Sequence, residues 1–100
     1  MDFDNQAPPG PVDAEATVVI TNRRGLHARA AAKFVKLAAQ FDATVDVLKG
    51  ETRVYGQSIM GLMMLAAGPG TELRLEAKGA QAQAAIEALA DLVGRKFDED

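Results

Sequence analysis

The chain has no cysteine and no tryptophan among its 100 residues, and it contains one tyrosine and one histidine. Without cysteine it can form neither disulfides nor Cys-based zinc sites, and thiolate catalysis is excluded too; this composition fits a reducing compartment. Positive charge is also scarce, because the formal net charge is −3 at pH 7. This acidic balance argues against a general nucleic-acid binder, whose surface is basic.

Long apolar runs are missing as well. No stretch approaches the roughly 18 apolar residues of a membrane span. The first five residues have neither the basic start nor the apolar core of a signal peptide. We therefore expect a cytoplasmic protein without membrane insertion. A chain of 100 residues can form one domain with a modest core, so any chemistry should lie at its surface.

Proline is concentrated near the start of the chain, where three of the four prolines occur and no helical or strand period is visible. We interpret residues 1–14 as a flexible N-terminal tail, because such a segment buries too little apolar surface to fold alone. Residues 15–95 are interpreted as the folded domain. The acidic residues 96–100 are expected to form a frayed C-terminus.

Within residues 15–95 the hydrophobic period changes repeatedly between the strand and the helix pattern. The resulting order of elements is β-α-β-β-α-β-α. Strands are expected at 16–21, 44–48, 53–55 and 71–78, and helices at 28–41, 58–65 and 82–93. Hairpins mixed with helices favour an α+β two-layer sandwich, in which three helices cover one face of a four-stranded antiparallel sheet.

The single histidine, His27, lies where a loop meets the helix that follows it. A neutral imidazole is a good nucleophile, and imidazole titrates close enough to neutral pH for the neutral form to be common. A helix N-terminus favours an anion, and Arg29 could add a bidentate contact to a phosphoryl group. Position alone leaves open that His27 is a polar surface residue and that Arg23, Arg24 and Arg29 belong to a solvated loop.

Two segments of the chain resemble a known family. Residues 25–31, Gly-Leu-His-Ala-Arg-Ala-Ala, strongly resemble the active-site signature of HPr, the histidine-containing phosphocarrier of the bacterial phosphoenolpyruvate phosphotransferase system. Residues 58–65, Ser-Ile-Met-Gly-Leu-Met-Met-Leu, are similar to its second signature. The resemblance covers about residues 15–95. It implies the open-faced HPr fold, phosphorylation of His27 on Nδ1, and Arg29 as the supporting cation.

One position departs from the family's pattern. The family usually has proline directly after the arginine, whereas this chain has Ala30. Proline in the first helical turn fixes φ and gives up an N–H that would have no partner there. Because alanine is a strong helix former, we expect the turn to persist, while the fine geometry and the rate of transfer are affected.

The expected helix at 58–65 has almost no polar residue after its first position. A short surface helix buries one face, so part of this methionine-rich surface should face solvent as an adaptable patch. The alternative is that Met63 or Met64 fills gaps in the core. In the HPr family this helix docks onto enzyme I and IIA proteins. The partner-binding residues implied by the resemblance are Leu26, Arg29, Ile59, Met60 and Met63.

Ser58 has two interpretations. As an N-cap, its hydroxyl would accept a hydrogen bond from an N–H of the first helical turn, a contact typically worth about 1 kcal/mol. In some members of the family the matching serine is phosphorylated by a regulatory kinase. Nearly two added negative charges beside Ile59 and Met60 would hamper docking. The resemblance thus implies a regulatory site wherever an HPr serine kinase/phosphorylase is present.

As a whole, the resemblance implies a monomeric phosphocarrier, without cofactor, that takes a phosphoryl group from phosphorylated enzyme I and passes it to a IIA-type protein. It would be a substrate and donor in phosphotransfer and not an enzyme. Residues 62–65 and the acidic ending look more like the nitrogen-related branch, and residues 58–61 more like the sugar-transporting branch. This mixture favours a regulatory role of nitrogen or mixed type.

The alternative is an α+β ligand- or RNA-binding module without phosphoryl chemistry, because such folds host unrelated functions. RNA binding predicts stacking aromatics and a positive surface. One tyrosine, no tryptophan and a net charge of −3 fit that function poorly. A metal site is not expected either, since one histidine lacks partners at ligand spacing.

Overall fold

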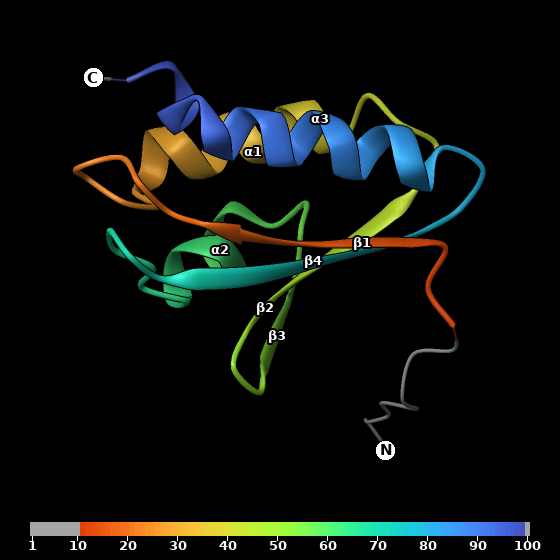
Figure 1. The fold of residues 1–100 in the computed structure, drawn as a ribbon, viewed down its shortest axis with the longest axis horizontal. Coiled ribbons are helices and arrows are strands. Elements are labelled where there is room, and N and C mark those ends of the chain that lie inside the picture. Colours follow the sequence, from red (N-terminus) through yellow and green to blue (C-terminus); the bar gives the residue numbers. More distant parts are fainter. Residues whose placement is uncertain (1–10, 100) are drawn as a thin grey trace.

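The computed structural model describes residues 11–99, and its elements follow the predicted order with one short 3-10 turn added at the end (Figure 1). The strands are β1 (Ala14–Val19), β2 (Thr44–Lys49), β3 (Thr52–Tyr55) and β4 (Glu72–Lys78). The helices are α1 (Ala28–Ala38), α2 (Ile59–Met64) and α3 (Ala82–Gly94), and the 3-10 turn η1 spans Lys96–Asp98.

The four strands form one antiparallel sheet in the order β1-β4-β2-β3. The last strand in the sequence, β4, therefore lies between β1 and β2. Helices α1 and α3 run side by side along one face of the sheet, as Figure 1 shows, while the short α2 contacts α1 and β3. This arrangement confirms the predicted open-faced α+β sandwich.

The core lies between the sheet and the helices. Alternate residues of each strand and one stripe of each long helix are buried, as the two periodicities require. The buried apolar strand residues are Ala14, Val18, Val45, Val47, Leu73, Leu75 and Ala77. The buried residues of α1 and α3 are Ala30, Ala31, Phe34, Ala38, Ala82, Ala85, Ile86, Leu89, Leu92 and Val93. Each large apolar side chain buried in this way contributes about 1.5–3 kcal/mol.

Several boundaries differ from the sequence prediction, and the largest differences are at the end of α1 and at the two ends of β1. Helix α1 ends at Ala38, although the apolar period continues to Phe41, because the chain then closes into tighter turns in which Gln40 N–H donates to Leu37 O at 3.0 Å. Strand β1 begins at Ala14 and not at Ala16. The long elements were predictable from their period, and their ends depend on local hydrogen bonds.

The start of the domain is tied to the sheet before β1. Asp13 N–H donates to Ala77 O at 2.8 Å, and its carboxylate accepts from Gly79 N–H at 2.8 Å. Residues 13 and 14, which the sequence assigned to the tail, therefore belong to the folded domain. Residues 1–10 of the predicted tail lie outside the described residues.

Residues 96–99 differ from the expected frayed end. Lys96, Phe97 and Asp98 have φ values of 60°, 56° and 61°, a left-handed conformation that costs a non-glycine residue roughly 1–2 kcal/mol. Two contacts offset this cost. The Phe97 side chain is fully buried, at 0% exposed, and Lys33 Nζ donates to Phe97 O at 2.7 Å. The folded part of the chain thus continues to Glu99.

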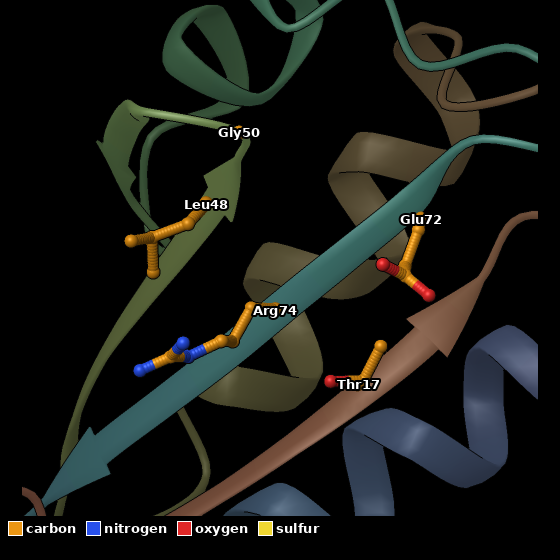
Figure 2. A pocket seen from close by; sticks show the side chains of 5 residues that line it. All are labelled: Thr17, Leu48, Gly50, Glu72 and Arg74. Carbon is orange, nitrogen blue, oxygen red and sulfur yellow. The ribbon is translucent and has the colours of Figure 1, made fainter.

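The open face of the sheet carries a closed network of charges. Glu76 is only 5% exposed because Arg74 Nη2 and Arg53 Nη1 lie 2.8 and 3.0 Å from its carboxylate oxygens. Figure 2 shows the Arg74 side chain extending along this face beside a shallow hollow. The hollow is lined by Thr17, Leu48, Gly50, Glu72 and Arg74. Since both arginines are paired with carboxylates, this hollow has no free charge with which to hold an anion.

Candidate functional site

The loop before α1 fixes the position of His27. Asn22 is fully buried, and its Nδ2 donates to Gly25 O at 2.8 Å, which closes a tight turn. Gly25 has φ +67°, and a Cβ at this position would lie 2.5 Å from Ala67 O, so only glycine fits. Leu26 N–H then donates to Ala67 O at 2.9 Å. The loop therefore places the next residue, His27, at the start of α1.

His27 is the N-cap residue of α1, with an extended backbone (φ −77°, ψ 179°) and no hydrogen bond from its side chain to the helix. Its carbonyl accepts the first helical bond, from Ala31 N–H at 2.8 Å. The N–H groups of residues 28–30 have no intrahelical partner in such a geometry, and the first turn holds no acidic residue. This end of the helix is therefore a positive site next to an imidazole.

Arg29 lies in the first turn of α1 and is exposed. Within residues 11–99 it makes no hydrogen bond and no ion pair. Its guanidinium is thus available to an anion brought to the helix start. The structure brings the two predicted site residues to the same turn, with Ala30 continuing the helix between Arg29 and Ala31.

Glu99 also lies at the site, although the sequence interpretation placed it in a frayed end. One of its carboxylate oxygens contacts His27 Nε2, and the other accepts from Asn22 Nδ2 at 3.0 Å. The side chains of His27 and Glu99 are 16% and 14% exposed. Burial favours a higher pKa for Glu99, but hydrogen bonds from Asn22 and His27 and the charge of Arg24 outweigh it and lower the pKa below its ordinary value.

A shallow hollow of about 190 Å³ opens beside the imidazole. It is lined by Arg24, Leu26, His27, Ala66, Ala67 and Gly68, the last three of which follow α2. Enclosed small-molecule sites are larger, about 300–1,000 Å³. The hollow therefore suits a group that is held on the surface and presented to another protein.

Ser58 is the N-cap residue of α2, as predicted. Its Oγ accepts from Gly61 N–H at 2.9 Å, which satisfies one of the free donors of the first turn. Leu62 and Leu65 face the core at 0% and 3% exposed. The opposite side of α2 is therefore left to solvent.

Four large apolar side chains of α2 are exposed. Ile59 and Met63 are 42% and 45% exposed, and Met60 and Met64 are 71% and 79% exposed. The alternative that Met63 or Met64 fills the core is therefore wrong. Leu26, also predicted to bind partners, is only 6% exposed, so its side chain supports the loop from within. We call the residues Ile59, Met60, Met63 and Met64 the α2 patch.

Neither a metal site nor a membrane span is found in the part of the chain that the structure describes. Among residues 11–99 no three histidine, aspartate or glutamate side chains are grouped so that they could hold a metal ion. None of the helices formed by these residues has the length and apolar character needed to cross a membrane. The site consists of the His27 imidazole with Glu99 on its Nε2, the N-terminus of α1, and Arg29, which has no ion pair among these residues.

An open-faced sandwich with one nucleophilic imidazole at a helix start, next to an exposed apolar patch, fits a protein that carries a group between partners. A family model described as "PTS HPr component phosphorylation site" matches residues 14–95. The chain is 51% identical over 83 residues to phosphocarrier protein HPr of Neisseria meningitidis serogroup B, which covers 83% of this chain and 93% of that protein. It belongs to the HPr family of phosphocarrier proteins of the phosphotransferase system.

Two further relatives agree with this assignment. Phosphocarrier protein NPr of Shewanella violacea is 46% identical over 85 residues, covering 85% of this chain and 93% of that protein. The crystal structure of HPr-C-His from Thermoanaerobacter tengcongensis matches with a TM-score of 0.83 at 42% identity, covering 87% of this chain and 98% of that one. The fold and the family therefore extend over nearly all of the described residues.

Proposed function

We propose that His27 accepts a phosphoryl group on Nδ1 from phosphorylated enzyme I and passes it to a IIA-type protein. The main support for this proposal is the position of the imidazole at the start of α1, beside an open hollow. Within the described residues Nδ1 has no hydrogen-bond partner, whereas Nε2 contacts Glu99. The nitrogen with the free lone pair is thus the one that a donor can reach.

In the proposed transfer, the Nδ1 lone pair attacks phosphorus and the bond from phosphorus to the donor atom breaks, its electron pair leaving with the donor. Catalysis of such a step depends mainly on positioning and on neutralising the charge of the phosphoryl oxygens. The free N–H groups at the start of α1 and the guanidinium of Arg29 supply that neutralisation. The reverse sequence of bonds delivers the group to the acceptor.

The α2 patch is the docking surface of this proposal. A carrier must bind a donor and an acceptor in turn, and exposed methionines adapt to different partner surfaces. Ser58 lies at the edge of the patch, so its phosphorylation by an HPr serine kinase/phosphorylase would place negative charge beside Ile59 and Met60. We also propose that the chain is monomeric and cytoplasmic, as expected from the sequence.

The proposal also concerns which branch of the phosphotransferase system the chain serves. Relatives named HPr and NPr match the chain at similar identity, 51% and 46%. We propose the regulatory role of nitrogen or mixed type from residues 58–65 and the acidic ending. Comparison of the sugar-type and nitrogen-type enzymes I as donors separates the two branches.

The proposal is tested by incubating the chain with labelled phosphoenolpyruvate and a purified enzyme I, beside a His27→Ala variant. We expect acid-labile label on the wild-type chain and none on the variant, because phosphohistidine is the only covalent intermediate proposed. Circular dichroism of the variant controls for its fold. Absence of label with both types of donor, in a folded wild-type chain, would refute the proposal.

A further inference from the structure

Glu99 has a contact that the carrier role leaves unassigned, because it joins the imidazole to a buried side chain of the preceding loop. Its two carboxylate oxygens are divided between His27 Nε2 and Asn22 Nδ2. We propose that Glu99 is a positioning residue, which holds His27 as the tautomer with the proton on Nε2 and the lone pair on Nδ1. This inference rests on the proposed phosphorylation of Nδ1.

The tautomer follows from the donor and acceptor roles at this contact. An ionised carboxylate only accepts hydrogen bonds, so the nitrogen that contacts it must carry the proton. In a neutral imidazole the other nitrogen, Nδ1, then holds the lone pair. Among the described residues, the hydrogen bond that fixes a proton position on the ring is the one between Nε2 and Glu99. The contact therefore keeps the ring in its nucleophilic form.

The carboxylate is held in place from both sides. On the loop side, Asn22 is fully buried and its Nδ2 bonds both Gly25 O at 2.8 Å and Glu99 at 3.0 Å. On the other side, the buried Phe97 ring and the bond from Lys33 Nζ to Phe97 O fix the turn before Glu99. Three consecutive left-handed residues persist only where the surroundings hold them in this way. Glu99 is thus part of a built contact.

Phosphorylation of Nδ1 gives the contact with Glu99 a second effect, which is to stabilise the charge of the ring. When the Nδ1–P bond forms and the donor–P bond breaks, Nε2 keeps its proton and the ring becomes cationic. Arg24 and the positive end of α1 oppose that charge, whereas Glu99 compensates for it. Asp98, the other carboxylate of the turn, pairs with Arg95 instead and lies near Lys33. Glu99 therefore favours both the attacking tautomer and the phosphorylated ring.

The substitution Glu99→Gln gives a result that a purely structural role would not. Glutamine has one oxygen and one NH₂ group, and Asn22 Nδ2 requires the oxygen as its acceptor. Asn22 cannot turn its own amide over without losing the bond to Gly25 O. The NH₂ of the new side chain then faces His27 Nε2, which places the lone pair on Nε2 and the proton on Nδ1. The near-isosteric variant should thus be the less reactive one.

The test combines ¹⁵N NMR of the imidazole, at a pH where it is neutral, with the rate of phosphoryl transfer from phosphorylated enzyme I. We expect the Nε2–H tautomer in the wild-type chain, a mixture in Glu99→Ala, and the Nδ1–H tautomer in Glu99→Gln. Transfer should slow by about tenfold in Glu99→Ala, the loss of roughly one charge-assisted hydrogen bond, and by more in Glu99→Gln. Asp98→Asn, which removes the same charge from the same turn without touching His27, is the matched control and should transfer at the wild-type rate.

The outcomes distinguish a failure of the positioning role of Glu99 from a failure of the proposed phosphorylation of Nδ1. If Glu99→Gln keeps the wild-type tautomer, or transfers faster than Glu99→Ala, the positioning role is overturned. If the wild-type chain is never labelled while the tautomers change as stated, the proposed function fails, and the effect of Glu99 on the ring stands. The tautomer is measured on unphosphorylated protein, so a failure of transfer cannot hide the result. Amide spectra of residues 96–98 show whether the turn is intact in each variant.

Discussion

The side chains that meet at His27 come from distant parts of the chain. Asn22 precedes the imidazole in the loop, whereas Glu99 lies 72 residues beyond His27. Arg29 is presented by the same helix and makes no hydrogen bond or ion pair with either of them. At the scale of the residue, the site is therefore one nucleophile with a carboxylate on Nε2 and open access to Nδ1. Gly25 makes this arrangement possible, because a larger residue would move the loop away from residue 67.

Gly25→Ala should destabilise the chain and displace His27. Alanine at φ +67° is strained by roughly 1–2 kcal/mol, and its Cβ would in addition lie 2.5 Å from Ala67 O. We expect a fall in the free energy of unfolding of more than about 2 kcal/mol, measured by urea denaturation. Gly50→Ala is the matched control, because Gly50 has φ +58° but nothing within 4 Å of an added Cβ. Equal losses in both variants would contradict the role of the clash.

At the scale of the element, α2 and its cap combine stability with docking. The Ser58 hydroxyl stabilises the first turn, while four apolar side chains on the outer side remain exposed. A helix of six residues is marginal without such a cap and without packing against α1. The same residue is thus placed to affect both stability and partner binding.

The two roles of Ser58 are separable by substitution. Ser58→Ala removes the cap and should lower the free energy of unfolding by about 1 kcal/mol, with little effect on transfer. Ser58→Asp keeps a capping oxygen but adds charge beside Ile59 and Met60, so it should retain stability and weaken transfer to His27. Thermal unfolding and transfer kinetics measure the pair. Unchanged transfer in Ser58→Asp would count against a regulatory effect at this position.

The stability of the 3-10 turn η1 should depend on pH, because the carboxyl group of Glu99 titrates. The pKa of this carboxyl lies below its ordinary value of 4.5, so its contacts with Asn22 and His27 stabilise the turn above that pH. They are lost as pH falls through the lowered pKa, because a protonated carboxyl no longer favours these donors. Amide NMR of residues 96–99 should therefore show the turn loosening in acid. The same transition in Glu99→Ala would assign it to another group, such as Asp98.

The sequence was informative for elements with a period and silent for η1. The stripe from Ala82 to Val93 and the alternation from Leu73 to Ala77 follow directly from burial on one face. In contrast, a single phenylalanine among charged residues shows no period, and three left-handed residues without glycine have no local signal. The contact of Glu99 with His27 depends on that turn, so it could not be predicted. The positions of His27 and Ser58 could be, because helix starts have recognisable neighbours.

At the scale of the whole molecule, the two faces of the sandwich differ in kind. The open face of the sheet is occupied by paired charges around Glu76, whereas the imidazole lies at the start of α1, which runs along the other face (Figure 1). This division leaves the chemistry at the surface, where a phosphoryl group can pass from one protein to another.

The most direct test of phosphorylation at His27 Nδ1 is NMR of the chain labelled with ¹⁵N in histidine only. The spectra are followed during phosphorylation by phosphoenolpyruvate and enzyme I. Because the chain has one histidine, every labelled signal belongs to His27. We expect Nδ1 to couple to phosphorus while Nε2 keeps its proton, and the coupling to disappear when a IIA-type acceptor is added. A phosphoryl group that is bound to Nε2 or to another residue, with the imidazole signals unchanged at Nδ1, would contradict this expectation.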